Sequence, residues 1–193
     1  MNNNIEVHPL EPFLPPNAKL LMLGSFPPKK ERWGMNFYYP NFINDMWRIY
    51  GWIFFQDKGY FLADNKKSFD ERKIRSFLEE KGIAITDSGK EIIRLKDNAS
   101  DKFLEIVKTV DLHEILKKIP HCHVIMAAGQ KATSTFLTIV PVKEPKVGNY
   151  TEFMYDGRKM KLYRMPSSSR AYPKSIEEKA EDYRKVFMEL GMI

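Results

Sequence analysis

Four short apolar segments that recur along the chain constrain its fold more than any other feature. They cover residues 19–24, 82–87, 123–129 and 161–166, and each closes on glycine, aspartate or proline. Continuous apolar runs of this length are typical of strands that are buried on both faces of a parallel sheet. Helical patterns lie between them, so the sequence predicts a three-layer α/β/α sandwich on a mainly parallel four-stranded sheet.

The helix between the first two strands is predicted from its periodicity and its ends. Over residues 68–81, Ser68 and Glu71 have the spacing of a capping box, and apolar residues behind them share one face. Gly82 can end this helix, because glycine adopts the left-handed conformation of a helix C-terminus at little cost. We therefore expect a helix from Ser68 that packs on the sheet.

Three further helices and a hairpin are predicted in the second half of the chain. Ser175 and Glu178 form another capping box, which opens a final amphipathic helix. Shorter helices are expected over residues 111–118 and 131–139. Residues 156–157 read Asp-Gly between two alternating segments, a strong hairpin signal. The hairpin adds an antiparallel flap to the sheet.

Composition restricts the class of protein. The 193 residues, 43% of them hydrophobic, suit one domain over residues 1–193. Cys122 is the one cysteine, so neither an internal disulfide nor a cysteine set for zinc or an iron-sulfur cluster is available, and we expect no metal and no cofactor. No signal peptide or membrane span is recognisable, which predicts a cytoplasmic protein. We also expect a monomer. The net charge of +6 favours a polyanionic partner such as nucleic acid.

Ligands of open α/β sheets bind at the carboxyl ends of the strands, so the functional residues are expected there. The first strand leads into Gly-Ser-Phe-Pro and then into an aromatic-rich stretch, residues 33–47. The last strand leads into Met-Pro-Ser-Ser-Ser-Arg-Ala-Tyr at residues 165–172. The four expected positions follow Gly24, Asp87, Gly129 and Pro166.

Five motifs stand in an order that resembles one known family. They are a Gly-Ser-x-Pro turn, a Tyr-Tyr pair that leads into a His-Pro-x-Asn-x-Phe-Trp-like helix start, a Gly-Ile-x-Leu-x-Asp-like strand, an Asn-Gly-x-Lys-Ala-like turn and a Leu-Pro-Ser-x-Ser loop. In this chain the matching segments are residues 24–27, 38–47, 82–87, 128–132 and 165–169. The sequence thereby resembles the uracil-DNA glycosylase superfamily, and within it most closely the hypoxanthine-DNA glycosylase branch.

The chain departs from the pattern of that superfamily at several positions. Ser25 stands in the first turn, where other branches carry an acidic residue or asparagine, and Met165 replaces the histidine of the uracil-specific enzymes. Tyr39 precedes Pro40 where the branch has histidine, and Ala128 replaces an asparagine. The remaining histidines show no spacing that indicates a metal site, and we interpret them as ordinary surface or strand-end residues. These departures leave the base that is removed, and the retention of catalysis, open.

The resemblance implies that Asn44 positions the attacking water and stabilises the sugar during glycosidic cleavage. A neutral amide is a feeble base, so the carboxylate of Asp45 is a second candidate for activating water. The alternative is that Asn41 caps a helix that begins near residue 42 and that Asn44 only supports its first turn.

A base that is drawn out of the duplex needs a stacking face and hydrogen bonds at its edge. Tyr38 and Tyr39 are candidates for the stacking face, and Ser25 and Phe26 are expected beside them in the first turn. By position, Asp87 matches the superfamily residue that contacts the base edge, where it would accept N–H groups. It would equally well cap the turn after its strand.

The serine-rich loop is the predicted contact to the DNA backbone. Its hydroxyls and N–H groups suit phosphates, and arginine and tyrosine behind them suit the minor groove. A lysine at the start of a predicted helix adds a further contact, although a solvated lysine explains it as well. The expected DNA-binding residues are Lys131, Ser167, Ser168, Ser169, Arg170 and Tyr172.

Two functions follow from these patterns. The first is a monofunctional DNA glycosylase of base excision repair, which hydrolyses the N-glycosidic bond of hypoxanthine or uracil in DNA. The second is a binding protein on the same fold, catalytically weak, that recognises lesions or single strands. An esterase that uses Ser25 is disfavoured, because Gly-Ser-Phe-Pro lacks the Gly-x-Ser-x-Gly pattern of a nucleophile elbow.

Overall fold

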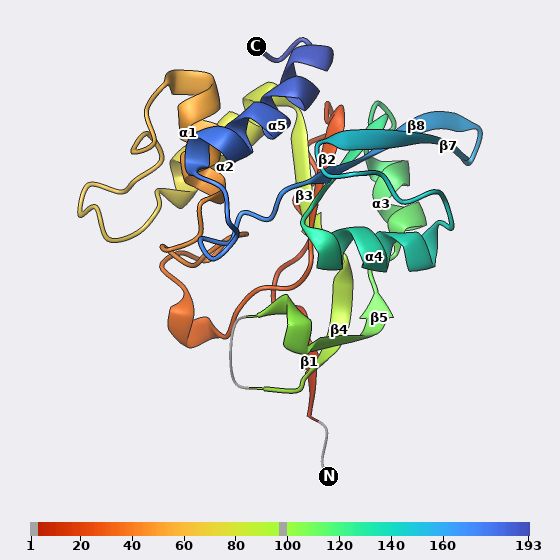
Figure 1. The fold of residues 1–193 in the computed structure, drawn as a ribbon, viewed down its shortest axis with the longest axis horizontal. Helices are drawn as coiled ribbons and strands as arrows, with labels where there is room; N and C mark the ends of the chain where they lie inside the picture. Colours follow the sequence, from red (N-terminus) through yellow and green to blue (C-terminus); the bar gives the residue numbers. More distant parts are fainter. Residues whose placement is uncertain (1–3, 97–99) are drawn as a thin grey trace.

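The computed structural model of the chain describes residues 4–96 and 100–193, and its centre is a mixed β-sheet (Figure 1). The sheet has five strands in the order β3-β2-β6-β8-β7, of which the first four are parallel. The expected four-stranded sheet is therefore one strand short. The strands are β2 (Leu20–Gly24), β3 (Ile83–Asp87), β6 (Val124–Ala128), β7 (Asn149–Tyr155) and β8 (Arg158–Met165).

The fifth strand comes from the hairpin that the Asp-Gly pair predicts. β7 pairs antiparallel with β8 along its whole length, from Asn149 opposite Arg164 to Tyr155 opposite Arg158. Asp156 and Gly157 both have positive φ, 46° and 76°, as a two-residue hairpin turn requires. Because the hairpin is paired throughout, its outer strand belongs to the sheet and is more than a flap.

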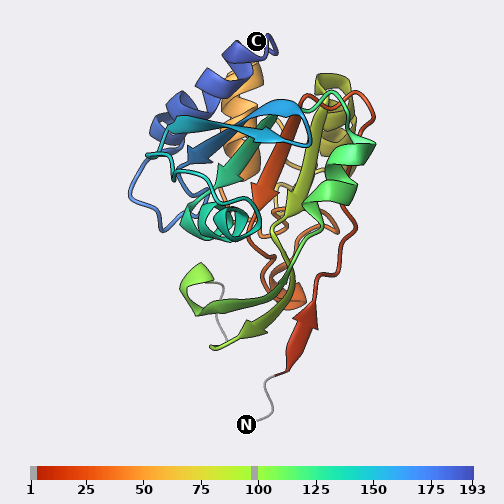
Figure 2. The same cartoon turned by 90° about the vertical axis from the view of Figure 1, so that its right-hand side faces the viewer.

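Helices cover both faces of this sheet, which gives three layers (Figures 1 and 2). Neighbouring strand residues face opposite layers: Met22 belongs to the core beneath one group of helices, and Leu21 to the core beneath the other. α1 (Met46–Phe55), α2 (Glu71–Lys81) and α5 (Ile176–Glu189) pack on the first face. α3 (Leu112–Lys118) and α4 (Gln130–Ile139) pack on the second face.

The helix ends follow the sequence signals with one exception. α5 begins with the predicted capping box of Ser175 and Glu178. α2, however, begins at Glu71, and the carboxylate of Asp70 accepts a hydrogen bond from the N–H of Lys73. The expected start at Ser68 is therefore wrong, because the nearer aspartate takes the capping position. Gly82 ends the helix with a φ of 67°, as predicted.

A second, smaller sheet lies beyond the carboxyl edge of β2 and β3 (Figure 2). Its antiparallel strands β1 (Ile5–Val7), β4 (Gly89–Arg94) and β5 (Leu104–Thr109) have the order β1-β4-β5. Phe26, Ile92 and Leu104 form its buried core. This sheet was not predicted from the sequence. Because β4 follows β3 directly, the small sheet is held against the edge at which ligands bind.

Candidate active site

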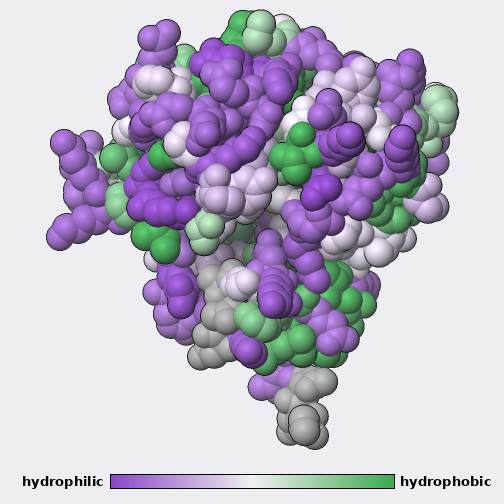
Figure 3. All heavy atoms as spheres, viewed as in Figure 1, coloured by the Kyte–Doolittle hydropathy of each residue, from purple (hydrophilic) through white to green (hydrophobic). Residues whose placement is uncertain are grey.

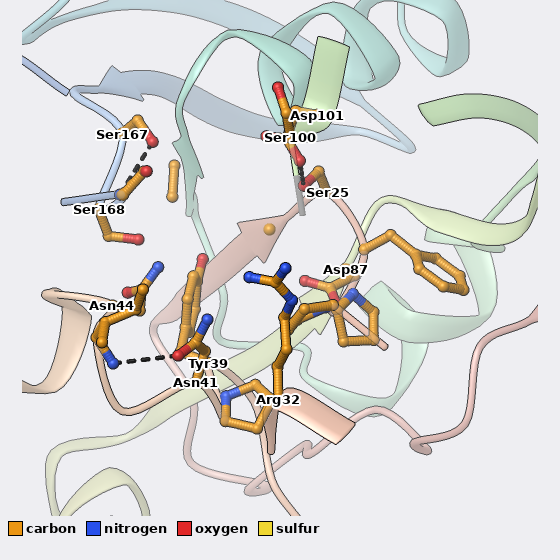
Figure 4. A pocket seen from close by; sticks show the side chains of 18 of the residues that line it. Ser25, Arg32, Tyr39, Asn41, Asn44, Asp87, Ser100, Asp101, Ser167 and Ser168 are labelled. Atoms are coloured by element: carbon orange, nitrogen blue, oxygen red, sulfur yellow. Dashed lines mark hydrogen bonds between the residues drawn. The ribbon is translucent and has the colours of Figure 1, made fainter. Parts of the chain in front are cut away.

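A cavity of about 570 Å³ opens at the carboxyl ends of the parallel strands, where the fold predicts a ligand (Figure 4). One wall comes from the segment before α1 and from the serine-rich loop after β8. The other wall comes from the turn after β2, from the end of β3 and from the small sheet with its loops. Figure 4 shows Asn44 on the first wall and the Ser25–Asp101 pair on the second. We call them the helix wall and the sheet wall.

The structure brings most of the predicted residues together around this cavity. Those that line it are Ser25, Phe26, Tyr39, Asn44, Asp87, Ser167, Ser168, Ser169 and Arg170. Four others are not part of its lining: Tyr38, Asp45, Lys131 and Tyr172. Arg32, Arg94 and Asp101 line the cavity as well and were missed from the sequence.

Asn44 reaches the cavity from the turn before α1. That helix begins at Met46, and the side-chain oxygen of Asn44 accepts the N–H of Met46 at 2.9 Å. The alternative of a helix that begins near residue 42 is wrong, since Asn41 instead accepts a hydrogen bond from the N–H of Ile43 within a turn. An amide oxygen has two lone pairs, so Asn44 supports the helix start and keeps hydrogen-bonding capacity for a ligand.

Asp45 is committed to ion pairs instead of the cavity. Its carboxylate receives hydrogen bonds from the ammonium group of Lys179 at 3.0 Å and from the guanidinium of Arg170 at 3.2 Å. Lys179 is fully buried on α5 and also donates to the carbonyl of Ser169 at 2.8 Å. Asp45 therefore joins α1, α5 and the serine-rich loop. This placement argues against the expected role in water activation.

The serine-rich loop is braced by its own hydroxyls. The hydroxyl of Ser167 accepts the N–H of Ser169 at 3.1 Å, and that of Ser169 accepts the N–H of Ala171 at 3.3 Å. A side chain at Gly129, whose φ is 91°, would place its Cβ 3.3 Å from the Cβ of Ser167. Glycine at this position therefore lets the start of α4 approach the loop closely.

The aromatic stretch mostly builds core. Tyr38 is 2% exposed, its hydroxyl donates to the carbonyl of Glu11, and its ring stacks on His8 with centroids 5.9 Å apart. This differs from the expected stacking face for a base. Phe37 and Trp47 are also buried in the core. Tyr39 alone turns into the cavity, with a left-handed φ of 52° that is uncommon for a non-glycine residue.

The sheet wall carries two carboxylates, and each has a specific partner. The Oδ2 atom of Asp87 lies 2.8 Å from Nε2 of His8, and both side chains are less than a tenth exposed. His8 was expected to be an ordinary surface or strand-end residue; it does follow strand β1, but its side chain is buried against Asp87 instead of exposed. The second carboxylate, Asp101, accepts a hydrogen bond from the hydroxyl of Ser25 at 2.7 Å.

The surroundings of Asp101 raise the pKa of its carboxyl group. Burial raises the pKa of its carboxyl group, the hydrogen bond from Ser25 opposes this rise, and the negative charge of Asp87 adds to it. Lys131 and Arg94 lower the pKa by weaker interactions. A cavity carboxylate whose pKa is raised by its surroundings is a candidate general base.

Comparison with known proteins supports the fold. No protein-family model matches the chain, and no curated protein matches it. Among solved structures, the chain is similar to a solution structure from Methanosarcina acetivorans that is described as a "putative Uracil DNA glycosylase". The two share 21% identity with a TM-score of 0.60, and the match covers 97% of this chain and 99% of the other. The chain therefore has the same mixed α/β fold as that protein.

The described part of the chain was also searched for metal-binding clusters and for membrane-spanning helices. Within residues 4–96 and 100–193, no group of three or more histidine, cysteine, aspartate or glutamate side chains is placed to hold a metal ion. Over the same ranges, no helix is long and apolar enough to cross a membrane.

Proposed function

We propose that the protein is a DNA glycosylase of base excision repair, which hydrolyses the N-glycosidic bond of a deaminated base, hypoxanthine or uracil, in DNA. The observation that carries the proposal is the cavity itself. It combines Asn44, two carboxylates and a braced serine loop at the carboxyl edge of the sheet. Its volume of about 570 Å³ falls within the range of small-molecule sites, about 300 to 1,000 Å³. The fold shared with the Methanosarcina protein supports the same activity class.

In the proposed reaction, a water oxygen attacks C1′ of the deoxyribose while the bond from C1′ to the base nitrogen breaks. The bonding electron pair leaves with the base, and one proton of the water must be taken up. Asn44 orients the water through its amide but is too weak a base to accept that proton. We assign the uptake of this proton to Asp101, because the carboxylate of Asp45 is engaged in ion pairs with Lys179 and Arg170. The products are the free base and an abasic site.

The remaining cavity residues suit a flipped nucleotide. Phe26 and Tyr39 offer aromatic surface to the base, and Ser25 and Asp87 lie at the strand ends beside them. On the helix wall, the loop of residues 167–170 lines the cavity and is suited to the flanking phosphates. Lys131 and Tyr172, which do not line the cavity, would reach DNA only beside the flipped nucleotide.

The cavity also favours hydrolysis by water over attack by an amine. Among the described residues that line it there is no lysine, the side chain that forms a Schiff base with a sugar aldehyde. A monofunctional glycosylase, which leaves the abasic strand intact, agrees with this lining.

The direct test uses end-labelled duplexes that carry one hypoxanthine, uracil or xanthine, incubated with the protein and then cleaved with alkali. We expect strand breaks at hypoxanthine or uracil after alkali and none before it. Asn44→Ala should abolish the breaks. If no base is released from any duplex, or from the corresponding single strands, the proposed activity is wrong.

The second candidate is a protein that binds lesions without turnover. It is favoured by Met165, which is fully buried where uracil-specific enzymes carry histidine, and by Ala128, which presents only a methyl group to the cavity. Salt-dependent binding to lesion-bearing DNA, with no release of base, would support this function over the first.

A further inference from the structure

Two polar atoms, one from each wall, converge over Gly24 in the lining of the cavity. A Cβ placed on Gly24 would lie 2.1 Å from Oδ1 of Asp87 and 3.1 Å from the hydroxyl oxygen of Tyr39. The hydroxyl of Tyr39 is buried and has no hydrogen-bond partner among the described residues. Burial, and next the charge of Asp87, raise the pKa of Tyr39 well above its ordinary value, so this hydroxyl keeps its proton and can donate.

A buried hydroxyl that no described protein group binds, at the lining of a cavity, is available to donate to a ligand. An unpaired buried polar group costs about 1 to 3 kcal/mol, which a native structure tolerates where a ligand completes the bond. The left-handed φ of Tyr39 points the same way, since strained backbone persists mainly at functional positions. Glycine at position 24 is also required, because any side chain would fill the space between the two atoms.

His8 fixes the carboxylate of Asp87 in this arrangement. Its Nε2 lies 2.8 Å from Oδ2, so the other oxygen, Oδ1, is left for the cavity. Nδ1 of His8 lies 2.9 Å from the carbonyl oxygen of Leu10 and 3.2 Å from its backbone nitrogen, so contacts at both ring nitrogens hold the imidazole in place. The ring is clamped between Phe26, edge to face at 5.1 Å, and Tyr38.

We infer that His8 is a positioning residue for a reader of the base edge formed by Asp87 and Tyr39, specific for bases that carry a ring N–H beside a carbonyl. The inference rests on the proposed glycosylase function. Oδ1 of Asp87 accepts the ring N–H, and the hydroxyl of Tyr39 donates to the carbonyl oxygen. His8 contacts no substrate and acts by holding the carboxylate of Asp87 in its orientation.

The chemistry of deamination explains the value of such a reader. Adenine and cytosine present an amino group beside a bare ring nitrogen, whereas hypoxanthine and uracil present a carbonyl beside a ring N–H. The glycosidic bond fixes which ring position meets each protein group. In that fixed placement the acceptor oxygen of Asp87 faces the bare nitrogen of adenine or cytosine, lone pair to lone pair, and sites built to hydrogen-bond one pattern reject its counterpart strongly.

The test compares His8→Ala, His8→Gln and, as a matched control, His113→Ala, which removes a solvent-exposed histidine-aspartate pair with Asp156. Single-turnover release is measured for hypoxanthine against unsubstituted purine, and for uracil against 2-pyrimidinone, since the second member of each pair lacks both edge groups. We expect His8→Ala to slow release of the deaminated base about 10- to 100-fold and to reduce its advantage over the edge-free base. His8→Gln, which keeps an N–H donor, should restore most of both.

The outcomes separate this inference from the function on which it rests. If the unaltered protein releases no base, the proposed function fails. If it releases bases, yet His8→Ala leaves the ratio within each pair unchanged, the inference is overturned and the glycosylase assignment stands. Equal losses on both members of a pair without rescue by His8→Gln would show a purely structural histidine. Melting temperatures of all variants, with His113→Ala as reference, identify any variant that fails to fold.

Discussion

The two walls of the cavity each hold a carboxylate, but the partners of the two carboxylates differ. On the helix wall, Asp45 is balanced by two cations and held rigidly between elements. On the sheet wall, Asp101 is met at close range by the neutral hydroxyl of Ser25, and burial raises its pKa. A carboxylate that is fully paired stabilises the fold, whereas one without a close cation stays available for proton transfer. Asp45 directly follows the predicted catalytic Asn44 but is ion-paired. The partners of a carboxylate are therefore a better guide to a catalytic role than its distance from Asn44 in the sequence.

The largest effect should come from Asn44→Ala, which removes the amide of the helix wall. We expect single-turnover base release to fall about a thousandfold, similar to the loss of one preorganised polar group in other active sites. DNA affinity should change little, because phosphate contacts dominate it. Parallel measurement of the dissociation constant checks this separation, and Asn41→Ala on the same wall is the matched control. A loss of less than tenfold would move the chemistry to the sheet wall alone.

Lys179→Met should reveal the structural role of Asp45. It leaves a buried carboxylate with one of its two cations, so we expect a loss of about 3 kcal/mol in the free energy of unfolding, measured by urea denaturation. Lys185→Met, which removes a 59% exposed lysine from the same helix, should cost less than about 1 kcal/mol. If the two substitutions lower the free energy of unfolding equally, the buried ion pair with Asp45 contributes no more to stability than an exposed ion pair.

Asp101→Asn tests the sheet wall and should slow base release about a hundredfold, as loss of a general base does. The carboxylate must be ionised to accept a proton, so the rate of the unaltered protein should fall as the pH drops through the raised pKa of Asp101. This acid limb should disappear in Asp101→Asn. Ser25→Ala removes the hydrogen bond that lowers the pKa, so it should move the limb to higher pH.

The control for the pH profile of Asp101→Asn is a substitution of an exposed carboxylate. Glu105→Gln alters an exposed carboxylate in the small sheet and should leave the pH profile unchanged. An acid limb that survives in Asp101→Asn would show that Asp101 is not the group that limits the rate at low pH.

The helix wall was largely predictable from the sequence, because its signals are local. Buried strands are recognisable as apolar runs in the sequence. Asn44 and the loop of residues 167–170 lie in the segments that follow two of these runs. The exception is Asp45, whose partner Lys179 lies 134 residues further along the chain. A clue existed, since Lys179 is three residues after Ile176 and thus on the apolar face of α5, where an unpaired lysine is rare.

The sequence predicted Ser25, Phe26 and Asp87 of the sheet wall, but the part that the small sheet supplies was not predictable, because nothing local marks it. β4 and β5 place charged residues such as Lys90 and Glu105 among apolar ones, and a β-bulge near Glu91 breaks the alternation. His8 meets Asp87 across 79 residues of sequence, and a single histidine in an extended segment gives no sign of its partner. Such contacts arise only when the N-terminal strand β1 joins β4.

The smallest expected effect compares one arginine from each wall. Arg170, on the helix wall, is 55% exposed at the side chain, and Arg32, on the sheet wall, is exposed and lines the same cavity. If both contact phosphates, Arg170→Ala and Arg32→Ala should each weaken DNA binding about three- to tenfold and lower the salt slope by about one. Lys159→Ala, on the distant hairpin, is the control. A reduced slope for Arg170 alone would place the DNA backbone on the helix wall and leave the sheet wall to the base.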